Sequence, residues 1–272
     1  MKYLKKIIST TLVTMLLSTS LSFANFDKEA NFISKQNVDL SFYKYKPICI
    51  NDSFNVQMKK IVENSEFFKT DMSYPLLKIE DKYINKKGYK CKVIENINKQ
   101  ICNYVVDFSE KVKQESEEYK KQYEDIFSKS GQDYVKYKYE AYSDYQVTYN
   151  KDNLISIPIK TYKFTGGAHG ITYLKSYNYD LLSGKEIKLK DVFKKDVDYK
   201  EIVNSFIKDE IEKNKDIYFS NSEGFKGISD NQDFYIDNDG IVVYFQVYDI
   251  APYYVGIPRF KMTCEEFGKY FK

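Results

Sequence analysis

The chain has 272 residues with 42 Lys and Arg against 39 Asp and Glu, a formal net charge of +3, and a single histidine. The net charge equals that of the three lysines in residues 1–24, so the rest of the chain is formally neutral. A neutral chain lacks the basic face that nucleic-acid binding requires. One imidazole also excludes zinc sites built from two or three histidines, and we expect no metal site and no cofactor.

Residues 1–24 have the pattern of a secretory signal peptide. Three lysines precede the apolar stretch Ile7–Leu17, and Ser22-Phe23-Ala24 resembles a cleavage site. We expect a mature chain that begins at Asn25, is secreted or extracytoplasmic, and has no membrane span after signal cleavage. Retention of the stretch as an uncleaved anchor remains an alternative.

Four cysteines, Cys49, Cys91, Cys102 and Cys264, lie outside the signal peptide. In an exported chain they allow three disulfide connectivities. If a helix starts near Cys91, that residue lies about 16 Å along the axis from Cys102, beyond disulfide reach. No Cys-x-x-Cys pair is present, so neither a redox motif nor a zinc knuckle is indicated.

The first segments after the signal peptide give weaker patterns. Residues 25–64 are expected to form an N-terminal extension, with an extended strand where Val38, Leu40 and Phe42 alternate. Ser53 is placed to cap a short helix, whose apolar positions would be Phe54, Met58, Ile61 and Val62. A strand entered through proline follows at 74–79, and a Lys/Gly turn at 86–88.

A long amphipathic helix is the strongest local prediction. Its apolar positions recur every three or four residues at Ile94, Ile97, Ile101, Val105, Phe108 and Val112. Charged residues replace this stripe from Gln114 to Lys121, so we expect the far end of the helix to be solvated.

The pattern then changes to period two, which predicts a strand meander over 134–164 with Ile155, Ile157 and Ile159 on one side. Breaks are expected near Ser143 and at 150–153. Pro158 lacks an amide donor, which favours an edge or bulged strand over a central one. A second strand is predicted at 171–179, ending in a turn at 182–185.

The last third predicts a helix over 199–213, then a hairpin of 234–236 and 241–248 joined by an Asp/Asn/Gly turn at 237–240. That turn lacks the outer oxygen ligands of a calcium loop. Thr263-Cys264-Glu265-Glu266 is a capping box that opens a short C-terminal helix. Together these elements predict an α+β fold, with antiparallel sheets, a long amphipathic helix in the first half, and a second helix and a hairpin in the second half.

Three stretches taken together resemble a known extracytoplasmic region. They are Tyr162–Gly170, Asp180–Phe193 and Tyr248–Gly256. Their order and spacing are similar to the extracellular region of RsiV-type anti-sigma factors, whose N-terminal module is also found in the peptidoglycan deacetylase PdaC. The resemblance covers about residues 65–270 and implies two α+β modules, at 65–170 and 171–272.

The resemblance also implies a function. RsiV-type proteins bind lysozyme outside the cell, and their proteolysis then frees a sigma factor. Here only Met1–Lys6 precede the apolar stretch, and no deacetylase domain is recognised, so we expect the outer binding half alone. A basic lysozyme would call for acidic residues at the surface, and Asp249 is the only acid in the third stretch.

Two loops are expected to form one recognition surface. The first contributes Gly166, Gly167, His169 and Gly170, and the second contributes Asp249, Pro252, Tyr253 and Tyr254. Loops that follow sheet strands commonly carry binding sites, and rigid tyrosines suit sugar stacking or a protein cleft. The competing interpretation is that the tyrosines pack the hairpin onto the sheet, and the position of Tyr248 near a strand end suits such a core role.

The sequence thus predicts a secreted, non-enzymatic cell-envelope module that binds lysozyme or peptidoglycan. The alternative is a secreted hydrolase acting on cell-wall glycan or peptide, using a carboxylate pair, or Cys264 or a serine with His169 as base. No Gly-x-Ser-x-Gly nucleophile elbow is present, and no catalytic residue is predicted. A purely structural envelope protein is the third possibility.

Overall fold

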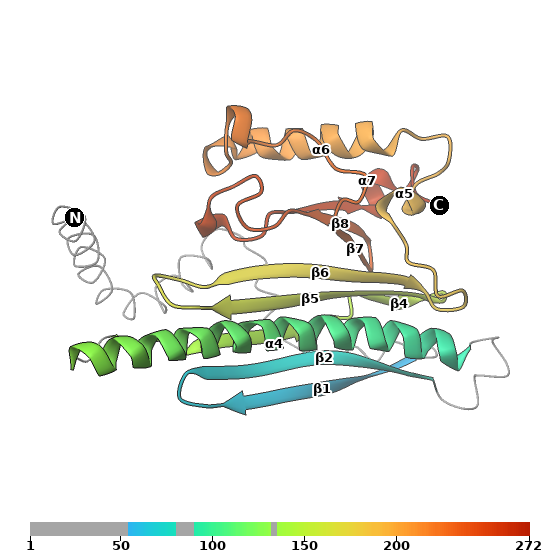
Figure 1. Ribbon diagram of the computed structural model, residues 1–272. Helices are drawn as coiled ribbons and strands as arrows, with labels where there is room; N and C mark the ends of the chain where they lie inside the picture. The colour runs from blue at the N-terminus through green and yellow to red at the C-terminus, as the bar shows by residue number, and fades with distance from the viewer. Residues whose placement is uncertain (1–53, 80–89, 132–134) are drawn as a thin grey trace. The chain divides into compact units, whose positions relative to one another are not determined.

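The computed structural model describes residues 54–79, 90–131 and 135–272 (Figure 1). The expected signal peptide, the strand near residue 40, Cys49, Ser53 and the turn at 86–88 lie outside the described residues. Within them the α+β class is confirmed, because strands gather into two sheets and a long helix lies in the first half. No helix in these ranges is long and apolar enough to span a membrane.

The larger sheet has six strands in the order β1-β2-β3-β5, with both β4 and β6 also paired to β5. The strands are β1 (Phe54–Asn64), β2 (Phe68–Ile79), β3 (Tyr139–Tyr145), β4 (Tyr149–Lys151), β5 (Leu154–Phe164) and β6 (Ile171–Asp180). All pairs are antiparallel except β2 and β3, which run parallel from Phe68 opposite Tyr139. A parallel pair needs a long crossover, and helix α4 (Cys91–Ser130) lies between these two strands in the chain.

The short helix predicted after Ser53 is wrong, because residues 54–64 form strand β1. Phe54, Met58, Ile61 and Val62 fit a three-to-four-residue spacing, but all eleven residues pair with β2 in one register. Val56 and Ile61 pack on the core, whereas Met58 and Val62 are exposed. Pairing with a neighbouring strand has overridden the local periodicity.

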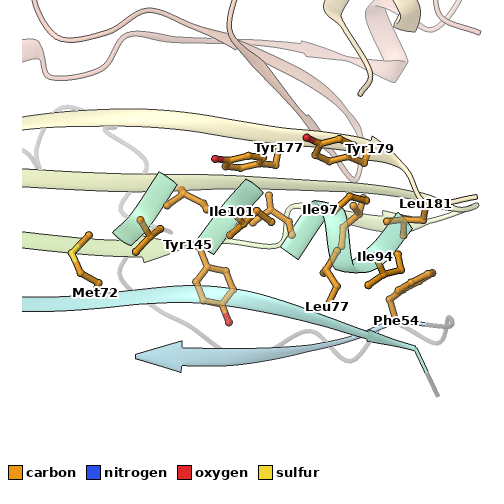
Figure 2. Packing of buried hydrophobic residues seen from close by; sticks show 14 of the residues in the cluster. Phe54, Met72, Leu77, Ile94, Ile97, Ile101, Tyr145, Tyr177, Tyr179 and Leu181 are labelled. Atoms are coloured by element: carbon orange, nitrogen blue, oxygen red, sulfur yellow. The ribbon is translucent and has the colours of Figure 1, made fainter. Parts of the chain in front are cut away.

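Helix α4 covers one face of the larger sheet, and its predicted stripe is confirmed. Ile94, Ile97, Ile101, Val105 and Val112 are all buried, while Phe108 is half-buried. They pack on the three isoleucines of β5 and on Met72, Leu77, Tyr177 and Tyr179; Figure 2 shows part of this cluster. The helix continues past the charged segment 114–121 to Ser130, and stops at Gly131 in the left-handed conformation.

The side-chain amide of Asn98 pairs with the backbone of β2 in the part of that strand that extends beyond its neighbour β3. Strand β3 pairs only with Phe68 to Met72, so the second half of β2 has no strand on that side among the described residues. Pro75 lies in this half, where a missing amide is tolerated. Asn98 of α4 donates its amide to the carbonyl of Leu77 at 2.9 Å and accepts from the Leu77 amide at 2.8 Å. The side chain thus takes the place of a strand.

Pro158 lies in a central strand, contrary to the expectation of an edge. Strand β5 has β6 on one side and both β3 and β4 on the other. The carbonyl of Pro158 accepts from the Gln146 amide at 3.0 Å, in the gap between the end of β3 and the start of β4. The missing donor therefore faces an interruption in the neighbouring strand. The predicted break near Ser143 is shifted to this gap, and Asp152 and Asn153 make the expected turn with positive φ.

The second half of the chain builds its own core under a three-stranded antiparallel sheet of β7 (Phe234–Asp237), β8 (Gly240–Tyr244) and β9 (Arg259–Thr263). Helix α6 (Tyr199–Lys213) is confirmed and buries Val203 and Ile207. The hairpin is confirmed but β8 ends at Tyr244, and β9 was not predicted. The remaining helical elements are α5 (Leu189–Val192), η3 (Lys215–Ile217), η4 (Asn221–Glu223), η5 (Tyr253–Val255) and α7 (Cys264–Phe267).

The predicted cap at Thr263 is present, since its hydroxyl accepts from the Glu266 amide at 3.3 Å at the start of α7. Of the cysteines, Cys91, Cys102 and Cys264 are free thiols, and α4 begins at Cys91 as expected. The Cys102 thiol lies 3.7 Å from the Tyr74 hydroxyl.

Polar side chains join the two cores. The outer edge of β7 meets the face of the larger sheet opposite α4, where Ser156, Asn178 and Thr148 are buried. The Ile236 amide donates to the Ser156 hydroxyl at 2.9 Å, and the Ile236 carbonyl accepts from Thr148 at 2.7 Å. Asn178 donates to the Phe234 carbonyl at 2.9 Å. These side chains satisfy backbone groups of β7 that would otherwise be buried without partners.

Candidate functional site

The glycine loop between β5 and β6 is shaped by backbone geometry. Gly166 and Gly167 have φ values of 91° and 92°, a region that other residues rarely adopt. A side chain at Gly166 would also approach the Tyr137 ring to 3.1 Å. Gly167 and His169 are exposed. Glycine is therefore favoured at 166 by its backbone conformation, and a side chain there would also press on the Tyr137 ring.

Gly170, at the other end of this loop, is enclosed by tyrosines. A side chain here would lie 2.4 Å from the Lys163 carbonyl and from the Tyr162 hydroxyl, so only glycine fits. The Tyr253 hydroxyl donates to the Gly170 carbonyl at 2.9 Å. Burial raises the pKa of Tyr162, and a backbone hydrogen bond from Gly170 opposes that shift.

The second predicted loop follows β8 and is fixed by four buried apolar residues. Val247, Ile250, Ala251 and Ile257 are buried, and the Ile250 carbonyl accepts from the Phe219 amide at 2.9 Å. Tyr254 lies between these anchors and is 62% exposed. A rigid base with an outward aromatic ring is an arrangement suited to recognition.

Tyr248 belongs to the same surface, which corrects the core role that its position suggested. It is 48% exposed and has a φ of 73°, a left-handed conformation that is uncommon for a bulky residue. Its ring lies 5.8 Å from that of Tyr253, at 36°. We call Tyr248, Tyr253 and Tyr254 the tyrosine surface.

Tyr253 has two roles in this surface. Its ring packs against the apolar cluster of Leu174, Val247 and Ile257, while its hydroxyl holds Gly170. The competing interpretation of a tyrosine that packs the hairpin onto the sheet therefore describes Tyr253, but not Tyr254. Pro252 precedes this turn in an extended conformation with a φ of −67°.

Two acids, Asp249 within the loop and Asp233 before β7, are bonded to Gln246. Asp249 accepts from the Gln246 amide at 2.8 Å, so its carboxylate shapes its own loop. The Gln246 side chain donates to the Leu174 carbonyl at 2.7 Å and to Asp233 at 3.2 Å, and accepts from the Leu174 amide at 3.0 Å. Burial raises the pKa of Asp233, and nearby Asp249 adds to that effect. Gln246 thus covers the edge of β6 as Asn98 covers that of β2.

The structure brings together part of the predicted surface. Gly170 and Tyr253 are in direct contact, and Pro252 and Tyr254 lie on the same turn as Tyr253. The ligand-binding roles of Gly166, Gly167, His169, Gly170, Asp249, Pro252, Tyr253 and Tyr254 remain predictions. Tyr248, Tyr162 and Gln246 were not selected from the sequence. Tyr162 lies in the same stretch as the glycines, but its contact with Gly170 depends on the chain reversing between β5 and β6.

Other chemistry was sought among the described residues. No group of three or more His, Cys, Asp and Glu side chains is placed to hold a metal ion there. Cys264, the alternative nucleophile, is exposed as the first residue of α7.

Two family models match separate parts of the chain. Residues 61–172 match the family described as deacetylase PdaC, and residues 190–265 match a protein family of unknown function, DUF3298. The chain is 26% identical over 206 residues to the peptidoglycan-N-acetylmuramic acid deacetylase PdaC of Bacillus subtilis. That match covers 74% of this chain but only 38% of the relative.

Two crystal structures share the fold. A DUF3298 family member from Bacteroides fragilis gives a TM-score of 0.56 at 22% identity, covering 80% of this chain and 94% of that one. Another from Pseudomonas aeruginosa gives 0.50 at 17% identity, covering 82% and 95%.

These comparisons support the predicted PdaC-like module and correct the prediction that the chain is not an enzyme. The relative that matches most of this chain is named as a deacetylase, so an expectation of no activity is contradicted. Over 74% of its length the chain is similar to a protein whose name gives peptidoglycan as its substrate.

Proposed function

We propose that this protein works at the cell envelope and binds the glycan strands of peptidoglycan through the tyrosine surface. The observation that carries the proposal is the exposed Tyr254 ring on a fixed turn, beside Tyr248 and Tyr253. Sugar rings present C–H faces that pack on aromatic rings, and tyrosine also offers a hydroxyl to the sugar's polar groups. Because the turn is held by buried neighbours, little conformational entropy is lost on binding.

The surface fits a glycan better than a basic protein such as lysozyme. A lysozyme site of the RsiV type would need carboxylates directed outward. Asp249 instead accepts a hydrogen bond from its own loop, and Asp233 is bonded to Gln246 and has a raised pKa. We therefore expect saturable binding to glycan strands and none to lysozyme.

The deciding experiment is titration calorimetry of the protein with peptide-free glycan strands and, separately, with lysozyme. Tyr254→Ala should weaken glycan binding by roughly fivefold, since one stacked ring contributes about 1 kcal/mol. Tyr254→Phe keeps the ring and should bind nearly as wild type. Tyr253 is unsuitable for this test, because its removal would also release Gly170.

Two controls define the result. Tyr142→Ala removes a tyrosine of β3 that lies against Tyr162, outside the tyrosine surface, and should leave affinity unchanged. Absence of glycan binding by the wild type, or lysozyme binding that Tyr254→Ala removes, would overturn the proposal. Acetate release is measured in the same samples, because the matched relative is named as a deacetylase. Release that falls with Tyr254→Ala would make the surface a substrate-binding element.

A further inference from the structure

The last turns of α4 carry aromatic residues beyond the buried stripe of the helix, and two of them, Tyr119 and Tyr123, pack edge-on against the buried Phe67 ring. The buried stripe of the helix ends at Ser116, and every residue from Glu124 to Ser130 is exposed. Tyr119, Tyr123 and Phe127 continue on the same side at four-residue intervals. We call these three residues the α4 stripe. In Figure 1 these turns extend beyond the ends of the neighbouring strands.

The α4 stripe changes from anchored to exposed along the helix. The Tyr119 hydroxyl donates to the Val135 carbonyl at 3.2 Å and accepts from the Tyr137 amide at 3.1 Å, and its ring stacks on Tyr139 at 5.1 Å. Tyr123 follows at 6.3 Å from Tyr119 and is half-buried. Phe127 lies 6.4 Å beyond it, nearly parallel at 6°, and is 47% exposed.

Two further apolar side chains lie beside the stripe or near its end. Ile126 is 49% exposed and Val135 is 53% exposed. The helix is kept regular here by the ion pairs Lys120–Glu124 and Lys129–Asp125 and by the left-handed cap at Gly131. An ordered helix end that presents aromatic rings to solvent is typical of a surface that binds a partner.

The stripe is continuous with one end of the glycine loop. Tyr119 contacts Tyr137 at 6.2 Å, and Tyr137 contacts Phe164 and fits closely against Gly166. Gly170, four residues along the chain, is bound by Tyr253 of the tyrosine surface. The α4 stripe therefore connects through Tyr137 to Gly166, the first glycine of the loop, and the tyrosine surface contacts Gly170, the last.

We propose that the α4 stripe is a second glycan-binding surface, which makes the protein selective for long strands over short oligosaccharides. This inference rests on the proposed function. Tyr123 and Phe127 supply two rings about 6 Å apart along the helix axis, a spacing suited to a linear chain of sugars. A strand that reaches both surfaces gains affinity, because the second contact is intramolecular.

Charge favours a neutral sugar chain over a lipid surface. Interfacial helices place an excess of Lys and Arg beside their apolar face to attract anionic headgroups. Here three lysines near the stripe pair with acids: Lys120 with Glu124, Lys129 with Asp125, and Lys136, which lies over the Phe67 and Tyr123 rings, with Glu66. The stripe thus offers aromatic area without a net positive charge.

The test is a titration of glycan strands of increasing length against the full chain. Wild type should gain roughly tenfold or more in affinity from the shortest to the longest strand. The double variant Tyr123→Ala/Phe127→Ala should lose that gain and keep the affinity for short strands. Ser128→Ala, on the same turns but on the opposite side of the helix from the stripe, is the control and should behave as wild type. Circular dichroism confirms that each variant is folded.

The outcomes separate this inference from the proposed function. If wild type binds short and long strands equally, or the double variant keeps the gain, the α4 stripe is not a glycan surface and the tyrosine surface still is. If Tyr254→Ala leaves all binding intact, the tyrosine surface fails instead. Binding of vesicles with 30% anionic lipid that the double variant loses would overturn the inference in favour of a membrane-facing helix.

Discussion

The two faces of strand β5 meet their neighbours by different means. One face presents Ile155, Ile157 and Ile159, fully buried under α4, where apolar side chains fill the space. The other face presents Ser156, also fully buried, which bonds to the backbone of β7. A helix has satisfied its own backbone and requires only shape, whereas the edge of a strand brings unpaired amides and carbonyls that require polar partners.

The largest loss of stability should follow a substitution in the apolar contact between α4 and the face of β5 that it covers. Ile101→Ala removes a fully buried side chain from the centre of the α4 contact, and we expect a loss of about 2–5 kcal/mol in the free energy of unfolding. Urea denaturation followed by circular dichroism measures it. Ile126→Ala, on the exposed end of the same helix, should change stability by less than about 0.5 kcal/mol. Equal losses in the two variants would show that α4 is not fixed by its buried stripe.

The polar face should respond less strongly but more selectively. Ser156→Ala leaves the Ile236 amide without its acceptor and removes a hydrogen bond to Asn178, which costs about 1–3 kcal/mol. Because the residue joins the two cores, we expect wild type to unfold in one transition in a urea titration and Ser156→Ala to unfold in two. Ser128→Ala, on the exposed part of α4, is the control. A Ser156→Ala protein with unchanged stability and one transition would show that β7 docks without these bonds.

Removing the hydroxyl of either of two tyrosines of β6, both on the apolar side of the sheet, should change the free energy of unfolding by a smaller amount and in opposite directions. Figure 2 shows Tyr177 and Tyr179 side by side on this strand. The buried Tyr177 hydroxyl has no hydrogen-bond partner among the described residues, whereas the Tyr179 hydroxyl donates to Gln100 at 2.7 Å. Tyr177→Phe should therefore raise the free energy of unfolding by up to about 1 kcal/mol, and Tyr179→Phe should lower it by a similar amount. A loss of stability in Tyr177→Phe together with a gain in Tyr179→Phe would contradict this assignment of the two hydroxyls.

The same tyrosines make stability depend on alkaline pH. Burial raises the pKa of Tyr179 to about 12, and raises that of Tyr177 as well. Unfolded tyrosine ionises near pH 10, so this stability is complete below about pH 10 and is lost as the pH rises toward 12. Tyr179→Phe should lose less stability than wild type between pH 9 and 11.5, measured by thermal unfolding. An identical pH dependence in both proteins would show that Tyr179 does not contribute to the loss of stability at alkaline pH.

Local patterns predicted most elements, and tertiary pairing explains the failures. The repeat of Ile94, Ile97 and Ile101 specified α4, since a single stripe must face the sheet. Residues 54–64 have an ambiguous period, and only their pairing with β2 decides for a strand. The parallel pairing of β2 with β3 and the buried role of Ser156 depend on partners far along the chain, so no local window contains them.

The geometry around the candidate residues was predictable to a similar extent. Glycine at 166 and 170 and the Pro-Tyr-Tyr turn drew attention because those residue types favour loops and recognition. The contact of Tyr253 with Gly170 joins positions 83 residues apart, and the outward direction of Tyr248 follows from its left-handed backbone. The α4 stripe was not predicted, because charged residues surround its three aromatic residues in the sequence and indicate a solvated helix end.

The parallel pair at the centre of the larger sheet has a consequence for how the protein reaches its native state. Phe68 finds its partner Tyr139 only after the intervening chain, including all of α4, has been made. The β1–β2 hairpin and the helix are local and can form within microseconds, but closing this long-range contact is slow. We therefore expect a transient intermediate in refolding. In it the β1–β2 hairpin and the helix are formed, and the edge of β2 that pairs with β3 in the native protein is still unpaired.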